Sequence, residues 1–225
     1  MKKIQRVAVR EGYDLWSESY DATPNPVVAM DARHTMGLLG PQAGERILDA
    51  GCGTGRNLAP MLAARSRPVG LDFSFGMLRV ARRKYGALPL LQADLQRTFP
   101  VRPAAFDAAL CALIGEHLSD LPMVFRETHA ALRPGGRFVF SVYHPELAAA
   151  GKEANFAQGD TEYRLGAFRY RTEDYQQLLD DAGFRDLTTH EFDGDAELAA
   201  AVPPAARYVG HPVLLVLQGR KPLSS

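Results

Sequence analysis

Alternating glycines follow a short apolar run near residue 50. The run Arg46 to Ala50 is expected to form a buried strand, and Gly51, Gly53 and Gly55 occupy every second position after it. Glycine lets a main chain turn tightly and lets a ligand approach where a Cβ would collide. The start of the helix expected next offers free N–H groups. The pattern therefore predicts a ligand site at the carboxyl edge of a sheet.

Two carboxylates beside this bend indicate the charge of the ligand. Asp49 precedes the first glycine, and Asp72 ends the next expected strand. A carboxylate at position 49 repels a pyrophosphate but suits a cation, and an acid at the end of the second strand suits ribose hydroxyls. The spacing is GxGxG, with Arg56 where a dinucleotide fingerprint has its third glycine. These features favour a cationic adenosyl compound over a dinucleotide.

The rest of the chain alternates short strands with helices, which predicts an α/β fold with a mostly parallel sheet covered on both faces. Strands are expected at 46–50, 68–72, 88–92, 106–113, 137–143, 184–192 and 212–218, the last two paired antiparallel. Helices are expected at 57–64, 74–86, 119–132 and 172–183, with Ser74, Ser119 or Asp120, and Thr172 as N-caps. A single domain is expected over 1–225, in which an N-terminal cap (1–40, an aromatic-rich loop and then a helix) and a lid (145–171) cover the active site.

The composition limits the classes of function. Lys plus Arg and Asp plus Glu both number 26, so the basic excess of a duplex nucleic-acid binder is absent. Cys52 and Cys111 form no CxxC pair and have no histidine at ligand spacing, so no metal site is predicted. No signal-peptide pattern appears, and no apolar run approaches the ~18 residues of a membrane span. We therefore expect a cytoplasmic protein that does not insert into membranes.

Five segments in order resemble the class I S-adenosylmethionine (SAM)-dependent methyltransferases, most closely the small-molecule branch that includes ubiquinone- and menaquinone-type enzymes. They are 47–55, 70–74, 92–95, 106–110 and 132–136, and they cover about residues 45 to 143. The pattern Tyr13-Asp14-x-Trp16-x-x-x-Tyr20-Asp21 also resembles the N-terminal signature of that family. The resemblance implies a Rossmann-like three-layer sandwich with a seven-stranded, mostly parallel sheet whose last strand is antiparallel.

The resemblance also implies SAM as cofactor, S-adenosylhomocysteine (SAH) as product, and roles for individual residues. Asp49 and Gly51 would hold the methionine end, and Asp72 would take the ribose hydroxyls. Asp94 would accept from the adenine amino group, with a backbone donor from Leu95. The residues expected at the cofactor are Asp49, Gly51, Cys52, Gly53, Gly55, Asp72, Phe73, Met77, Asp94, Leu95, Cys111, Ala112 and Tyr20.

Catalytic candidates are fewer, because methyl transfer depends mainly on alignment and on exclusion of water. His117 and His144 follow the fourth and fifth expected strands and are candidates for a general base, although each also suits a structural role. Tyr13, Trp16 and Tyr20 are candidates for closing over the sulfonium through cation–π contacts. The lid arginines Arg164, Arg169 and Arg171 suit either an acidic acceptor or a solvated loop.

The favoured function is methyl transfer to an N or O nucleophile of a small-molecule acceptor, by a monomer or homodimer. An RNA or protein methyltransferase is one alternative, disfavoured by the balanced charge and by Cys111-Ala112-Leu113-Ile114 where amide and exocyclic-amine methyltransferases carry Asn/Asp-Pro-Pro-Tyr. A non-catalytic SAM-binding scaffold is another, disfavoured by the intact glycines and Asp72. A different reaction of SAM also remains open.

Overall fold

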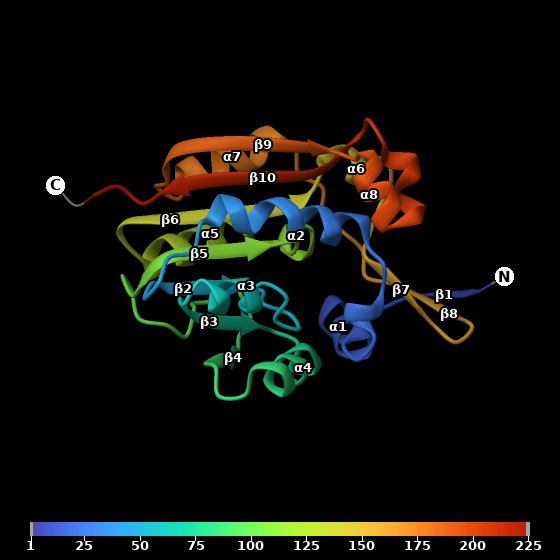
Figure 1. The fold of residues 1–225 in the computed structure, drawn as a ribbon, viewed down its shortest axis with the longest axis horizontal. Coiled ribbons are helices and arrows are strands. Elements are labelled where there is room, and N and C mark those ends of the chain that lie inside the picture. The colour runs from blue at the N-terminus through green and yellow to red at the C-terminus, as the bar shows by residue number, and fades with distance from the viewer. Residues whose placement is uncertain (1, 224–225) are drawn as a thin grey trace.

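The centre of the protein is a seven-stranded sheet, seen in a computed structural model that describes residues 2–223 (Figure 1). The strand order is β4-β3-β2-β5-β6-β10-β9. The strands are β2 (Arg46–Ala50), β3 (Arg67–Asp72), β4 (Leu90–Gln92), β5 (Phe106–Ala112), β6 (Leu132–Tyr143), β9 (Arg185–Asp193) and β10 (Pro212–Arg220). β10 runs antiparallel to both of its neighbours, whereas β2 to β6 pair in parallel. The predicted fold class is confirmed.

The order of the strands places a crevice above the middle of the sheet. From β2 the chain adds β3 and β4 on one side and then β5 and β6 on the other. The strand order therefore reverses between β2 and β5, and ligands of open α/β sheets bind at such a switch point, beyond the carboxyl ends of the strands. The glycine bend after β2 lies at that edge.

Helices bury apolar side chains on both faces of the sheet. On one face, α2 (Pro26–Leu39) and α3 (Leu58–Ala63) contribute Met30 and Met61 to a cluster that includes Leu110 of β5. On the other, α5 (Leu121–Ala131) and α7 (Thr172–Asp181) contribute Phe125 and Tyr175 to a second cluster. Successive residues of a strand point to opposite faces, which gives the three-layer sandwich.

Helix ends follow the expected capping chemistry with some differences. Ser74 Oγ accepts from the backbone N–H of Met77 at the start of α4 (Phe75–Tyr85), and Asp120 rather than Ser119 caps α5. The expectation that Thr172 caps α7 is wrong, because Arg171 is the N-cap residue and its backbone N–H donates to the Asp174 carboxylate. Thr172 is already inside the first turn.

A second, smaller sheet, which was not expected from the sequence, joins the two covering regions. It has the order β1-β8-β7, formed by β1 (Lys3–Arg6), β7 (Asn155–Gln158) and β8 (Thr161–Arg164). β1 pairs in parallel with β8, which ties the N-terminal cap to the lid. Figure 1 shows this sheet beside one end of the central sheet.

The aromatic-rich loop expected before α2 is in fact largely helical. α1 spans Val9–Trp16, and the 3-10 helix η1 spans Tyr20–Ala22. Tyr13 and Trp16 lie one turn apart on α1, which places both on one face. The remaining elements are α6 (Pro145–Ala149), α8 (Ala196–Ala201), η2 (Gly115–His117) and η3 (Pro203–Tyr208). Within residues 2–223, no helix combines the length and apolar character needed to cross a membrane.

Candidate active site

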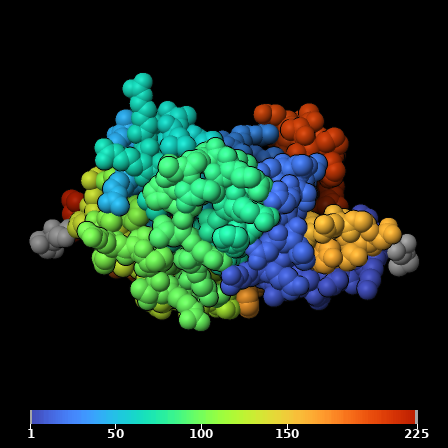
Figure 2. Space-filling view, turned by 90° about the horizontal axis from the view of Figure 1, so that it is seen from below, coloured from blue at the N-terminus to red at the C-terminus, as the bar shows by residue number. Residues whose placement is uncertain are grey.

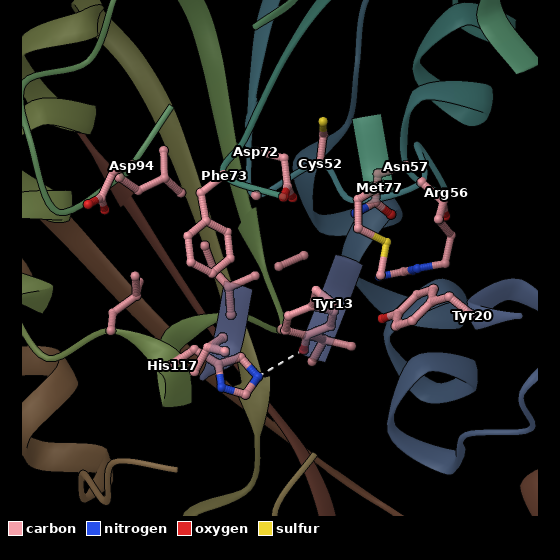
Figure 3. Close-up of a pocket in the computed structure, with 18 of the residues that line it drawn as sticks. Tyr13, Tyr20, Cys52, Arg56, Asn57, Asp72, Phe73, Met77, Asp94 and His117 are labelled. Atoms are coloured by element: carbon pink, nitrogen blue, oxygen red, sulfur yellow. Dashed lines mark hydrogen bonds between the residues drawn. The ribbon is translucent and has the colours of Figure 1, made fainter. Parts of the chain in front are cut away.

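A cavity lies over the carboxyl ends of β2, β3 and β5 and is called the first cavity here (Figure 3). In the close-up, Asp94 lies on one side of the central space, Arg56 and Tyr20 lie on the other, and Tyr13 and His117 lie across from Asp72. Its walls are formed by Val9, Tyr13, Tyr20, Gly51, Cys52, Thr54, Arg56, Asn57, Asp72, Phe73, Met77, Asp94, Leu95, Gln96, Ala112, Leu113, Ile114, His117 and Leu118.

The three glycines of the bend have positive φ angles, but their surroundings differ. A Cβ at Gly51 would lie 2.6 Å from the Ile114 side chain, and one at Gly55 would lie 2.5 Å from the Tyr85 ring. A Cβ at Gly53 would meet no atom within 4 Å. Gly51 and Gly55 therefore allow close packing around the bend, whereas Gly53 leaves open space beside it.

Asp72 is held by the backbone on two sides. Its Oδ2 accepts from the Gly53 N–H and its Oδ1 from the Ser74 N–H, each at 2.8 Å. Burial raises the pKa of Asp72 to about 6, although these N–H groups act in the opposite direction. Each carboxylate oxygen has a further lone pair, so the oriented carboxylate is suited to accept from two neighbouring hydroxyls of a ribose.

Beside the bend, two opposite charges have buried atoms without partners. Both carboxylate oxygens of Asp49 are buried without a hydrogen bond, and burial raises its pKa to about 7. Arg56 donates through Nη2 to Asp31 Oδ2 at 2.6 Å, but its buried Nη1 has no partner. Unpaired buried charge is costly. An α-amino acid supplies an ammonium and a carboxylate that match this pair, so the residues present fit the methionine end of SAM.

Most of the predicted cofactor residues converge on the first cavity. Those that line it are Gly51, Cys52, Asp72, Phe73, Met77, Asp94, Leu95, Ala112 and Tyr20. Asp49, Gly53 and Gly55 shape the bend without being part of the wall. The structure does not bring Cys111 to the cavity, because its side chain leaves β5 on the face opposite Ala112 and packs in the core.

The N-terminal cap is anchored to this cavity by two aspartates of the N-terminal signature, to which the sequence alone assigned no role. Asp14 Oδ1 accepts from Ser74 Oγ at 2.6 Å and from the Gly76 N–H at 2.8 Å, at the start of α4. Asp21 accepts from Thr54 Oγ1 at 2.7 Å beside the glycine bend. Each aspartate directly follows a tyrosine in the sequence, and that Tyr-Asp repetition was the available signal.

The anchoring places the cap against the first cavity. Tyr13 and Tyr20 line the first cavity while their neighbouring aspartates hold the segment in place. Figure 2 shows the blue N-terminal segment packed between the green residues of the main domain and the orange hairpin of β7 and β8. The cap thus forms one wall of the first cavity.

A second cavity adjoins the first and shares Tyr13, Tyr20 and Leu113 with it. Its other walls come from the cap, the segment after β5, the end of β6 and the lid: Trp16, Thr23, Pro24, Asn25, Pro26, Val27, Val28, Glu116, Tyr143, Lys152, Glu153, Ala154, Asn155, Phe156 and Ala157. The two predicted covers therefore build this cavity together. The shared residues mark the boundary at which the two spaces meet.

His117 and Glu116 bring titratable groups to this boundary. His117 lines the first cavity, and its Nε2 lies 2.8 Å from the Tyr13 hydroxyl. Burial lowers the pKa of His117 to about 4, so the ring is neutral near pH 7. Glu116 lines the second cavity, and burial raises its pKa to about 7. Sequence reasoning passed over Glu116, because nothing in its local pattern marks it as buried.

His144 is not brought to either cavity. It is the N-cap of α6, where its Nδ1 accepts from the Glu146 N–H at 3.3 Å, and its Nε2 lies 3.4 Å from Glu191 of β9. Pro145 holds His144 in an extended conformation, as expected, but that conformation directs the ring toward β9. The structure supports a capping role for this residue.

The three lid arginines differ in their ion pairs and in their surroundings. Arg171 pairs with Asp174, and Arg164 pairs with Glu153 and Glu162. Arg169 forms no ion pair among the described residues and lines a separate shallow hollow beside the lid. In the part of the chain that the structure describes, no group of three or more His, Cys, Asp or Glu side chains is placed to hold a metal ion.

Comparison with known proteins agrees with this site. A model of the methyltransferase domain family matches residues 48–140. A malonyl-[acyl-carrier protein] O-methyltransferase from Serratia marcescens is 33% identical over 73% of this chain and 64% of its own length. One from Pseudescherichia vulneris is 30% identical over 77% of this chain and 67% of its own length. A demethylmenaquinone methyltransferase from Symbiobacterium thermophilum is 32% identical over 58% of this chain and 57% of its own length.

The fold agrees as well. A SAM-dependent methyltransferase from Mesorhizobium loti superimposes with a TM-score of 0.71, at 24% identity, over 85% of this chain and 97% of that one. The chain belongs to the SAM-dependent methyltransferase family. It spans about two thirds, or less, of the length of the three methyltransferases compared by sequence.

Proposed function

We propose that this protein binds SAM in the first cavity and transfers its methyl group to an N or O nucleophile of a small molecule held in the second cavity. The observation that supports this most strongly is the set of complementary groups around the glycine bend. Asp72 is oriented for a ribose, and the orphaned atoms of Asp49 and Arg56 match an amino-acid zwitterion. Bound SAM would supply an electrophilic methyl group on a sulfonium.

The protein's own residues would mainly bind, orient and exclude water. Phe73 and Met77 would pack beside the adenine, with Asp94 accepting from its amino group and Leu95 donating from its backbone. Tyr13, Tyr20 and Leu113 stand where the two cavities meet, so they would surround the reacting atoms. Alignment of two reactants in a dry site accounts for much of the rate enhancement in such displacements.

The acceptor, the location and the assembly state are part of the same proposal. The relatives named above include methyltransferases of malonyl-[acyl-carrier protein] and of demethylmenaquinone. The balanced charge supports a small-molecule acceptor over a nucleic acid. We propose a cytoplasmic enzyme that acts as a monomer or homodimer.

Calorimetric titration with SAM and SAH tests the proposal. The wild-type protein should bind both, and Asp72→Ala should weaken both by about 100-fold, because bidentate acceptance from a ribose is lost together with a charge-assisted contact. Asp186→Ala, on the exposed surface of β9, is the matched control and should leave both affinities unchanged. Absence of binding by the folded wild-type protein would refute the proposal.

A further inference from the structure

Glu116 carries a buried charge for which the structure offers no compensation. Its side chain is 8% exposed and lines the second cavity. Oε2 is buried without a hydrogen-bond partner, and Oε1 lies 3.8 Å from His117 Nε2. That nitrogen is engaged with the Tyr13 hydroxyl at 2.8 Å. A buried unpaired carboxylate is expensive in free energy, so a structural role does not account for it.

The groups around Glu116 do not neutralise it. On its own element, the Glu116 carboxylate faces only His117. Burial lowers the pKa of His117 to about 4, so this ring is neutral near pH 7. The negative charge of Glu116 also acts on side chains of other elements, namely Cys111, Tyr13, Tyr20, Tyr143 and Tyr175. Burial raises the pKa of each of these groups. All of these groups are uncharged at neutral pH.

Among the described residues, no lysine or arginine of the second cavity or its lid forms an ion pair or hydrogen bond with Glu116. Glu153 pairs with Arg6 and Arg164. Lys152 lines the second cavity, and its ammonium lies 5.8 Å from the centre of the Tyr208 ring. Arg169 is exposed, and its positive charge acts to lower the pKa of the Tyr143 hydroxyl, against the larger effect of burial. Aromatic side chains form part of the lining, with Trp16 and Phe156 stacked at 4.9 Å, and Glu116 is the buried acid of the cavity.

The lid holds Glu116 in this position. The backbone N–H of Phe168 donates to the Glu116 carbonyl at 2.7 Å, and the Tyr170 hydroxyl donates to the Leu118 carbonyl at 2.9 Å. At Gly115 a Cβ would lie 2.6 Å from both the Phe140 and Val142 side chains. The 3-10 turn that carries Glu116 is therefore clamped between β6 and the lid, which fixes the carboxylate against the cavity.

We infer that the second cavity takes an uncharged aromatic acceptor with a hydroxyl or amine, and that Glu116 removes the proton of that group through Oε1, the less deeply buried of its two oxygens. The inference rests on the proposed function. As the acceptor's oxygen or nitrogen lone pair forms its bond to the methyl carbon, the bond from that carbon to sulfur breaks and its electron pair stays on sulfur. The acceptor's proton passes to Oε1 and leaves later to solvent. An anionic carboxylate acceptor would instead be repelled by Glu116.

Binding of matched probes to the SAH-loaded protein tests the acceptor class. The probes are 1-naphthol, 1-naphthylamine and 1-naphthoate, which share one ring system and differ in the reacting group. At pH 8 the wild-type complex should bind 1-naphthol at least about 10-fold more tightly than 1-naphthoate. This preference should shrink as the pH falls below about 7, because Glu116 becomes protonated.

The variant Glu116→Gln keeps the shape of the side chain and removes its charge. It should bind 1-naphthoate as tightly as 1-naphthol at every pH from 5 to 8, whereas the exposed control Glu173→Gln should behave as the wild type. A wild-type complex that binds 1-naphthoate as well as 1-naphthol at pH 8, or that does not bind 1-naphthol at all, overturns the inference. Failure to bind SAH would instead count against the proposed function.

Methyl transfer to 1-naphthol tests the role in proton removal. Glu116→Gln should lower kcat by about 100-fold, at the lower end of general-base effects, while KM and the affinity for SAM change by less than about 3-fold. The wild-type rate should rise with pH through about 7, and the variant should lack this limb. An unchanged kcat in the variant, or a wild-type rate with 1-naphthol no greater than with 1-naphthoate, contradicts the inference.

Discussion

The two cavities differ in how the chain builds them. The first is formed where successive parallel strands end, so its residues follow the order of the sheet, and its central acid, Asp72, is held by backbone N–H groups. The second is assembled from the N-terminal cap, the turn after β5 and the lid. The first cavity is therefore a product of the central fold, whereas the second is a product of two segments that meet in a separate small sheet.

The largest expected effect is that of Arg56→Met, which should lower both the stability of the protein and its affinity for SAM. Asp31 is fully buried and would lose its ion pair, although Thr35 and Ser141 still donate to it. Breaking a buried pair by removing one partner typically costs 3–5 kcal/mol, and the exposed part of Arg56 reduces this to about 3 kcal/mol. Urea unfolding should show this loss, and calorimetry should show weaker SAM binding. A variant with wild-type stability and SAM affinity would contradict the role given to Arg56.

The next largest effect concerns the buried carboxylates of both cavities, which should make the stability of the protein depend on pH. Burial raises the pKa values of Asp49 to about 7, of Asp72 to about 6 and of Glu116 to about 7. The folded state therefore binds more protons than the unfolded state between about pH 4 and pH 7, so stability falls as the pH rises through that window. The free energy of unfolding without ligand should drop by at least about 1 kcal/mol from pH 5 to pH 8.

SAM should reduce this pH dependence, because its ammonium offsets the charge of Asp49. The stabilisation by a fixed SAM concentration is expected to be larger at pH 8 than at pH 5 when followed by thermal unfolding. Glu116→Gln serves as the control that removes the contribution of the second cavity alone. A ligand effect that is equal at both pH values would mean that Asp49 does not meet the cation.

Tyr13→Phe should have a smaller effect, and it should distinguish cofactor binding in the first cavity from methyl transfer at the boundary of the two cavities. The change removes the hydroxyl that lies 2.8 Å from His117 Nε2 and keeps the ring between the cavities. Because the ring is retained, SAM affinity should stay within about 3-fold, whereas methyl transfer should fall by about 10-fold, close to the 1.4 kcal/mol of one hydrogen bond. Equal losses in affinity and turnover would show that Tyr13 belongs to cofactor binding alone.

Arg6→Ala, in the small sheet, should have the smallest effect. The Arg6 side chain is 68% exposed and pairs with Glu153 at 3.1 Å. Exposed ion pairs contribute about 0–1 kcal/mol, so thermal unfolding should shift only slightly and SAM affinity should be unchanged. A large loss of SAM binding would mean that the small sheet supports both cavities rather than the second one only.

The sequence predicts the first cavity well because its signals are local. Positive φ angles require glycines at positions 51, 53 and 55, and the end of a buried strand places Asp72 beside them. Cys111 was expected at the cofactor, but successive residues of a strand point to opposite faces of the sheet. Ala112 therefore lines the cavity and Cys111 packs in the core. His144 was expected at the site because it ends a strand at the right edge, but capping of α6 and a contact to Glu191 turn it away.

The second cavity was predictable only as a location. Both covering regions were recognised, but their pairing through β1 and β8 depends on contacts between residues about 160 positions apart in the chain, with Lys3 facing Thr161. The importance of Glu116 arises from its burial, which Phe140, Val142 and the lid produce together. No local pattern carries that information, because burial at this position is a property of the assembled fold.

A crystal structure of the protein with SAH tests the division between the two cavities most directly. The ribose hydroxyls should lie at the Asp72 carboxylate, the amino-acid end should meet Asp49 and Arg56, and the sulfur should face the boundary formed by Tyr13, Tyr20 and Leu113. The second cavity should remain free for an acceptor beside Glu116. Placement of the adenosyl group in the second cavity, or an amino-acid end remote from Arg56, would contradict the account.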